Sequence, residues 1–189
     1  PGVIIDHKQF ASREAFDQAL DAALKDASVE LLCNAGFLRL HSEGFVRSWW
    51  NRHLNIHPSL LPAFRGLHTH ARVLDEGVKV TGCTVHFVRP EMDTGPIVAQ
   101  AAVAVLHGAV VGGGLELAAS CHVRVAESSA FYGLPEGQRG LFVGGGGSAR
   151  IPRLIGVARM TDMMLTGRVY DAREGHAIGI SHYLVEPDQ

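Results

Sequence analysis

A change of composition near residue 107 constrains this chain most, because it divides the sequence into two unlike pieces. Residues 1–107 contain all three lysines and seven of the 22 glycines, whereas residues 108–189 contain no lysine and fifteen glycines. No internal repeat and no low-complexity linker marks the join. A chain of 189 residues can bury a sizeable core without disulfides or a structural metal. In composition the chain therefore consists of two pieces.

Helix and strand patterns alternate along the first piece. Ser12 can cap a helix in which Phe16, Leu20 and Leu24 recur every four residues, with acidic residues on the other face. Strand and helix in turn predict an α/β fold with a mainly parallel sheet and flanking helices. We expect strands at 29–35, 54–57 and 78–88, and helices after Ser12, after Ser42 and at 69–77.

The second piece carries short strand patterns between glycine turns. Its pattern predicts strands at 107–111, at 123–126 and near 131–132, a helix from Leu115, and helices at 150–155 and 159–165.

Composition argues against several classes of partner. With a net charge of −2, the chain has no overall positive potential that would attract nucleic acid. The 22 residues between Asp93 and Glu116 lack charge, but Pro96, Gln100 and the glycines at 112–114 interrupt them, so we expect no membrane span. We expect small-molecule substrates. Exposed apolar strand edges would also allow the chain to form a homo-oligomer.

Metal binding is not expected either. The three cysteines are odd in number, widely spaced and without a CxxC pair, which suits a reducing cytoplasm. His68 and His70 have no acid or cysteine at typical ligand spacing.

A carboxamide and an imidazole lie two residues apart at the end of a predicted strand, in the segment NIHPSLLP that begins at Asn55. Asn55 and His57 therefore point to the same side of the strand. Such a pair suits a carbonyl that becomes tetrahedral, with Asn55 steadying the oxyanion and His57 donating a hydrogen bond or carrying a proton. Asp93, on a glycine-proline loop, could hold His57 charged or relay a proton through water.

The segments NIHPSLLPAFRGLHTHARVL and GCTVHFVRPEMDTGPIVAQAAV resemble the glycinamide ribonucleotide formyltransferases over about residues 1–106. The resemblance implies a Rossmann-like fold and formyl transfer from formyltetrahydrofolate to an amine in purine synthesis. It also implies that Asn55, His57 and Asp93 form the catalytic trio. The segment Phe37, Leu38, Arg39 and Leu40 would then line the folate site.

Three glycines, Gly112 to Gly114, precede a predicted helix in the second piece. Backbone amides at a helix start suit an oxyanion, and Glu116 follows in the first turn. Glu136 lies twenty residues later on a loop. Two carboxylates that share a pocket can divide base and acid roles on one water molecule.

The segments HGAVVGGGLELAASCHVRVAE and LPEGQRGLFVGGGG resemble the enoyl-CoA hydratases of the crotonase superfamily, over about residues 105–186. The resemblance implies that Gly113 supplies an oxyanion amide, that Glu116 and Glu136 are the catalytic acids, and that a coenzyme A thioester is the substrate. The first sheet would continue into a crotonase-like ββα segment. We therefore expect two partial domains, 1–106 and 107–189.

Three functions remain open from the sequence. Formyl transfer is the activity that the motifs imply first, and water addition to a coenzyme A thioester is the alternative. The third is a folded hybrid without catalysis. We rank this inert hybrid above complete formyl transfer and above complete hydration, because each piece lacks part of the substrate-binding region of the family it resembles.

Overall fold

The computed structural model describes residues 2–187 as a mixed α/β protein with two compact units. The first unit comprises Pro1–Gly77 and Gly82–Gln100, and the second comprises Val78–Thr81 and Ala101–Gln189. Two strands cross from one unit to the other along the chain, β3 (Val80–Phe87) and β4 (Ile97–Leu106).

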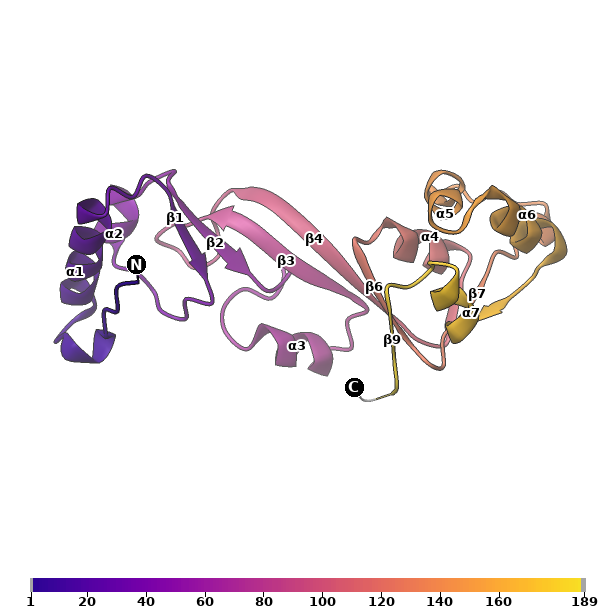
Figure 1. Cartoon of the computed structure of the whole chain (residues 1–189), viewed down its shortest axis with the longest axis horizontal. Coiled ribbons are helices and arrows are strands. Elements are labelled where there is room, and N and C mark those ends of the chain that lie inside the picture. The colour runs from indigo at the N-terminus through magenta and orange to yellow at the C-terminus, as the bar shows by residue number, and fades with distance from the viewer. Residues whose placement is uncertain (1, 188–189) are drawn as a thin grey trace. The chain divides into compact units, whose positions relative to one another are not determined.

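The strands of the first unit are neighbours in the order β1-β2-β3-β4 (Figure 1). The pair β1–β2 is parallel, and β2–β3 is antiparallel. The antiparallel pair departs from a purely parallel arrangement, because the connection through α3 enters β3 at the same end of the sheet at which the chain leaves β2. The other elements are η1 (His7–Gln9), α1 (Arg13–Asp26), β1 (Leu32–Ala35), α2 (Glu43–Ser48), β2 (His53–His57) and α3 (Thr69–Asp75).

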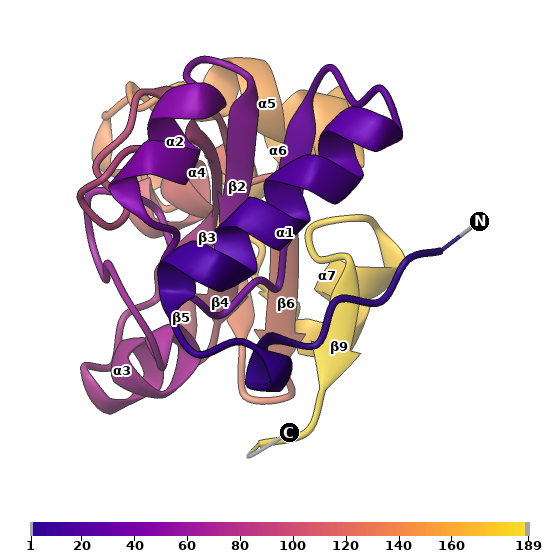
Figure 2. The same ribbon diagram turned by 90° about the vertical axis from the view of Figure 1, so that its left-hand side faces the viewer.

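Local capping explains where the first helices begin. The Ser12 side chain accepts a hydrogen bond from the Ala15 amide, and Ser42 caps α2 in the same way, as the sequence predicted. The two helices lie side by side (Figure 2), and the buried indole of Trp49 donates a hydrogen bond to Asp21 on α1 at 2.8 Å. This contact ties α1 to the end of α2.

The second unit contains two small groups of strands. The order β4-β6-β9 is parallel throughout, and in β5-β7-β8 the first pair is parallel and the second antiparallel. The strands are β5 (Ala109–Val111), β6 (Val123–Glu127), β7 (Phe131–Gly133), β8 (Tyr170–Asp171) and β9 (Tyr183–Val185). The helices are α4 (Gly113–Ser120), η2 (Gly137–Arg139), α5 (Gly147–Ile155), α6 (Val157–Thr166) and α7 (Ala172–Ala177).

The α/β class and the mostly parallel pairing expected from the sequence are confirmed. The sequence analysis did not predict β8, α7 and β9, which are short elements. An Asp171–Glu174 capping box starts α7. A contiguous apolar core of this unit includes Leu115, Tyr132 and Met163, each at most 1% exposed.

Candidate functional site

Strand β2 places Asn55 and His57 on one face, together with His53. In the β2–β3 pair, Asn55 lies opposite His86 and His57 lies opposite Thr84. The Asn55 carboxamide nitrogen is 3.2 Å from Nε2 of His86. The alternation of the two strands therefore creates a polar patch on one sheet face.

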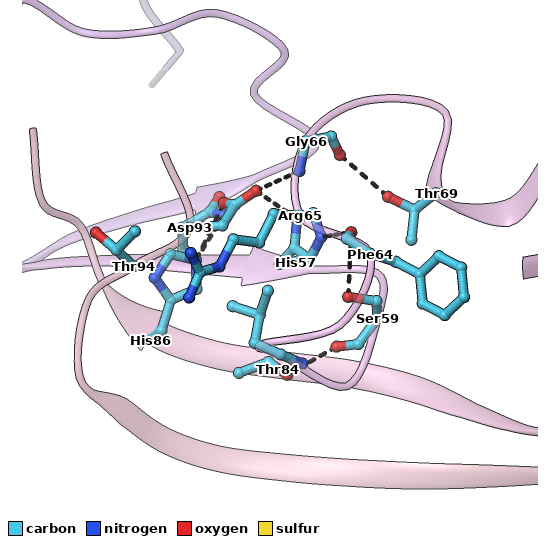
Figure 3. A network of polar contacts seen from close by, with 12 residues as sticks. His57, Ser59, Phe64, Arg65, Gly66, Thr69, Thr84, His86, Asp93 and Thr94 are labelled. Carbon is cyan, nitrogen blue, oxygen red and sulfur yellow. Dashed lines mark hydrogen bonds and ion pairs between the residues drawn. The ribbon is translucent and has the colours of Figure 1, made fainter. Parts of the chain in front are cut away.

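Asp93 reaches this patch from the loop after β3 (Figure 3). Its backbone is in the left-handed region at φ 54°, which turns the loop back toward β2. The Asp93 carboxylate lies 3.3 Å from Nδ1 of His57 and 3.6 Å from Nε2 of His86, and it accepts a hydrogen bond from the Gly66 amide at 2.8 Å. The structure thus links Asn55, His86, Asp93 and His57 in one chain of contacts.

The surroundings of Asp93 favour its ionised form. Burial by itself raises the pKa of this carboxyl, but His86, the Gly66 amide and His57 together outweigh burial and lower the pKa below its ordinary value. Asp93 is therefore a carboxylate at neutral pH.

His57 faces acceptors at both ring nitrogens. Nδ1 lies against the Asp93 carboxylate, and Nε2 lies 2.8 Å from the Phe64 carbonyl oxygen. A carbonyl and a carboxylate can both be satisfied only when both ring nitrogens carry hydrogen. The His57 ring is therefore held between the Asp93 carboxylate and the Phe64 carbonyl.

His86, which lies on β3, is a further polar residue of this site. In the structure it is 2% exposed, and its Nδ1 contacts the Phe87 carbonyl at 3.0 Å while Nε2 lies between Asn55 and Asp93. His86 lies two residues after Thr84 and opposite Asn55. The β2–β3 register would therefore have been needed to predict that it contacts Asn55 and Asp93.

A second polar cluster extends the same sheet face. Asn34 of β1 lies opposite Asn55, and its amide is 3.3 Å from Nε2 of His41. Nδ1 of His41 lies 2.9 Å from the Asp17 carboxylate. Burial lowers the pKa of His41, and the nearby Asp17 only partly offsets that effect. The polar residue Asn34 is therefore accommodated in its strand by a partner.

The predicted folate segment lies beside this cluster. The Phe37 ring stacks on the His41 ring with centroids 4.4 Å apart, and the Arg39 guanidinium lies 5.9 Å from the centre of the Phe16 ring. Leu38 and Leu40 are exposed. The segment offers an aromatic surface and two exposed apolar side chains.

The two glutamates of the second unit have different surroundings. Glu116 is buried in the first turn of α4, and its carboxylate accepts a hydrogen bond from the Gly147 amide at 2.9 Å. The Glu136 carboxylate lies against Gly112, and one of its oxygens is buried without a partner among residues 2–187. A Cβ at Gly113 would meet no atom within 4 Å, so its backbone is open.

Within residues 2–187, no group of three or more His, Cys, Asp or Glu side chains could hold a metal ion. No helix in that part of the chain is long and apolar enough to cross a membrane.

Family comparison separates the two halves of the chain. The profile of the formyl transferase family matches residues 1–113, and that of the enoyl-CoA hydratase/isomerase family matches residues 92–189. The chain therefore belongs to the formyl transferase family over its first part and to the enoyl-CoA hydratase/isomerase family over its second. The hybrid character predicted from the sequence is confirmed.

Individual relatives each match only part of the chain. The trifunctional purine biosynthetic protein adenosine-3 of Gallus gallus is 55% identical over 111 residues, which are 59% of this chain and 11% of that protein. The structure of glycinamide ribonucleotide transformylase 1 from Symbiobacterium toebii is 52% identical, with a TM-score of 0.52, over 54% of this chain and 48% of its own.

A structure from Rhodopseudomonas palustris CGA009, assigned as an enoyl-CoA hydratase, is 71% identical over 44% of this chain and 33% of its own, with a TM-score of 0.44. The chain thus spans less than half the length of each of these three relatives.

Proposed function

We propose that the first unit catalyses formyl transfer from formyltetrahydrofolate to the amine of glycinamide ribonucleotide, a reaction of purine synthesis that takes place in the cytoplasm. The observation that carries this proposal is the 3.3 Å approach of Asp93 to Nδ1 of His57, on the sheet face that also holds Asn55. The name of the Symbiobacterium toebii relative, glycinamide ribonucleotide transformylase 1, supports glycinamide ribonucleotide as the acceptor.

The proposed reaction begins when the amine nitrogen attacks the formyl carbon. Negative charge then develops on the formyl oxygen, where the Asn55 amide can donate a hydrogen bond, and His57 can donate a second one through Nε2 when that nitrogen turns from the Phe64 carbonyl. Asp93 orients the His57 ring through Nδ1 and can accept the proton that the amine loses, directly or through water. When the bond between the formyl carbon and folate N10 breaks, N10 takes up one proton. This equals the proton that the amine loses, so the reaction neither consumes nor releases protons overall.

We propose that Phe37, Leu38, Arg39 and Leu40 hold the folate. Phe37 already stacks against an imidazole, and Leu38 and Leu40 expose apolar surface that a planar ring system can cover. Both substrates are small molecules, and the described site supplies carboxylate, imidazole and amide groups for the chemistry.

Two measurements test the proposal. Calorimetry measures binding of a reduced-folate analogue, and mass spectrometry follows formylated glycinamide ribonucleotide. We expect His57→Ala and Asp93→Asn each to lower the rate of transfer about 10²- to 10⁴-fold with folate binding retained. Glu91→Gln, an exposed carboxylate on the same loop as Asp93, is the matched control and should keep the rate.

Absence of both folate binding and transfer in the unmodified chain would refute the proposal and favour the inert hybrid. Retention of the full rate in Asp93→Asn would show that the trio does not perform the reaction.

Water addition to a coenzyme A thioester is the second candidate, now for the second unit. The specific observation is the Glu136 carboxylate oxygen, which is buried and unpaired beside the start of α4, where Gly113 is open. Hydration of an enoyl-CoA by the full chain, abolished in Glu136→Gln, would support it. No hydration in the unmodified chain excludes it.

A further inference from the structure

A pocket of about 310 Å³ lies in the second unit, and none of the candidate catalytic residues lines it, although Gly114 on its wall adjoins Gly113. Its walls are the second half of β4, the start of β5, one face of α4 and the chain at Lys79 and Val80. The helix α4 presents Gly114, Leu117 and Ala118 to this pocket, whereas Glu116 turns to the amide of Gly147 on α5. The pocket and the glutamate therefore occupy different faces of α4.

The pocket combines residues of both families. Lys79 and Val80 lie in the part matched only by the formyl transferase profile, and Leu117 and Ala118 lie in the part matched only by the enoyl-CoA hydratase/isomerase profile. The backbone of Lys79 is fixed there, because its carbonyl accepts a hydrogen bond from the Val105 amide at 3.0 Å. The pocket is thus lined by residues from both parts of the chain.

The lining defines the chemistry of a ligand. Val80, Ala104, Leu106 and Val110 give an apolar interior, and Val105 and Leu117 add exposed apolar surface at 42% and 56% exposure. Among the residues that line it, the ionisable ones are Lys79 and His107. Among the ion pairs of residues 2–187, none includes Lys79. A cation at the edge of an apolar pocket complements an anion with an apolar tail.

We propose that this pocket binds a straight-chain carboxylate of medium length, with its tail in the apolar interior and its carboxylate at Lys79. The volume lies at the small end of the range for ligand pockets, which suits a single unbranched chain. This site is independent of formyl transfer and of hydration.

The probe is octanoate, titrated into the full chain by calorimetry, with hexanoate and decanoate as a length series. Each added methylene should raise the association constant about fourfold while it fits the pocket. Lys79→Gln should weaken octanoate about two- to fivefold and leave neutral 1-octanol unchanged. Lys25→Gln, which removes another exposed lysine, is the charge control.

Gly114→Leu tests the position of the tail without endangering the fold. A Cβ at Gly114 meets no atom within 4 Å, and leucine favours a helix more than glycine does. The added side chain enters the pocket, so octanoate binding should fall at least tenfold. Gly44→Leu is the matched control, because Gly44 is also helical and has nothing within 4 Å of its Cβ.

Three results would overturn the proposal. The first is an affinity that is the same for hexanoate, octanoate and decanoate. The second is an equal loss of octanoate and 1-octanol binding in Lys79→Gln. The third is unchanged octanoate binding in Gly114→Leu.

Discussion

Replacing His53 by leucine should remove a large part of the acid sensitivity of the first unit. His53 is 1% exposed, and neither of its ring nitrogens has a hydrogen-bond partner among the described residues. Burial, reinforced by the nearby His41 ring, lowers the pKa of His53 from 6.5 to about 4. The ring is consequently neutral in the folded protein at neutral pH.

The sign and size of the effect follow from this shift. Because the pKa of the folded state is below that of the unfolded state, the unfolded chain takes up the proton first as the pH falls. The contribution of the neutral His53 ring to the free energy of unfolding is therefore fully present above pH 6.5 and is lost as the pH falls from 6.5 to 4. One proton corresponds to about 1.4 kcal/mol for each pH unit, so His53 accounts for about 3 kcal/mol over this window.

The assay is urea unfolding at several pH values, followed by tryptophan fluorescence. Trp49 is 2% exposed and packs near Phe45, which contacts the His53 ring edge-on, so its signal reports on this unit. In His53→Leu, the dependence of the unfolding free energy on pH should decrease by about one proton. At pH 7 the variant should be about 1 kcal/mol more stable, because two unpaired polar atoms are removed.

His70→Leu is the control, since His70 is an exposed histidine of the same unit. The reasoning is refuted if His53→Leu and the unmodified chain lose stability equally between pH 6.5 and 4.

Two further substitutions test the packing of each unit. Asp17→Asn should cost about 2–3 kcal/mol of unfolding free energy by urea titration, because the buried Asp17 carboxylate accepts a hydrogen bond from the Ser42 amide and lies beside an imidazole. Gly112→Ala should lower the thermal stability of the second unit by at least ~2 kcal/mol, since Gly112 has φ +58° and a Cβ there would come 2.5 Å from the Glu136 carboxylate. Gly113→Ala, where that space is empty, should leave the melting temperature nearly unchanged in the same calorimetric scan.

Much of the fold could be predicted from local signals. Ser12 and Ser42 cap helices because their hydroxyls satisfy amides three residues ahead, and this depends on neighbouring residues alone. The strand before Pro58 was also predicted within one residue. The antiparallel direction of β3 was not, because a strand pattern in the sequence does not state its direction.

Part of the candidate site could likewise be predicted from the sequence, and part depended on the tertiary structure. Its motifs identified Asn55, His57 and Asp93, but the part played by His86 depends on its register opposite Asn55. Asn34 is a polar residue in β1, and only its register opposite Asn55 and its contact with His41 explain its place there. Register is set by hydrogen bonds between distant segments, so one strand's sequence does not determine it.

By itself, the sequence determined that two families meet in this chain and which residue types each contributes, because motif spacing is a property of the linear chain. Tertiary structure alone decided that Asp93 lies 3.3 Å from His57 while the Glu136 carboxylate packs against Gly112. It also decided that Lys79 and Leu117 line one pocket. Those positions result from packing between segments far apart in sequence, which no local pattern encodes.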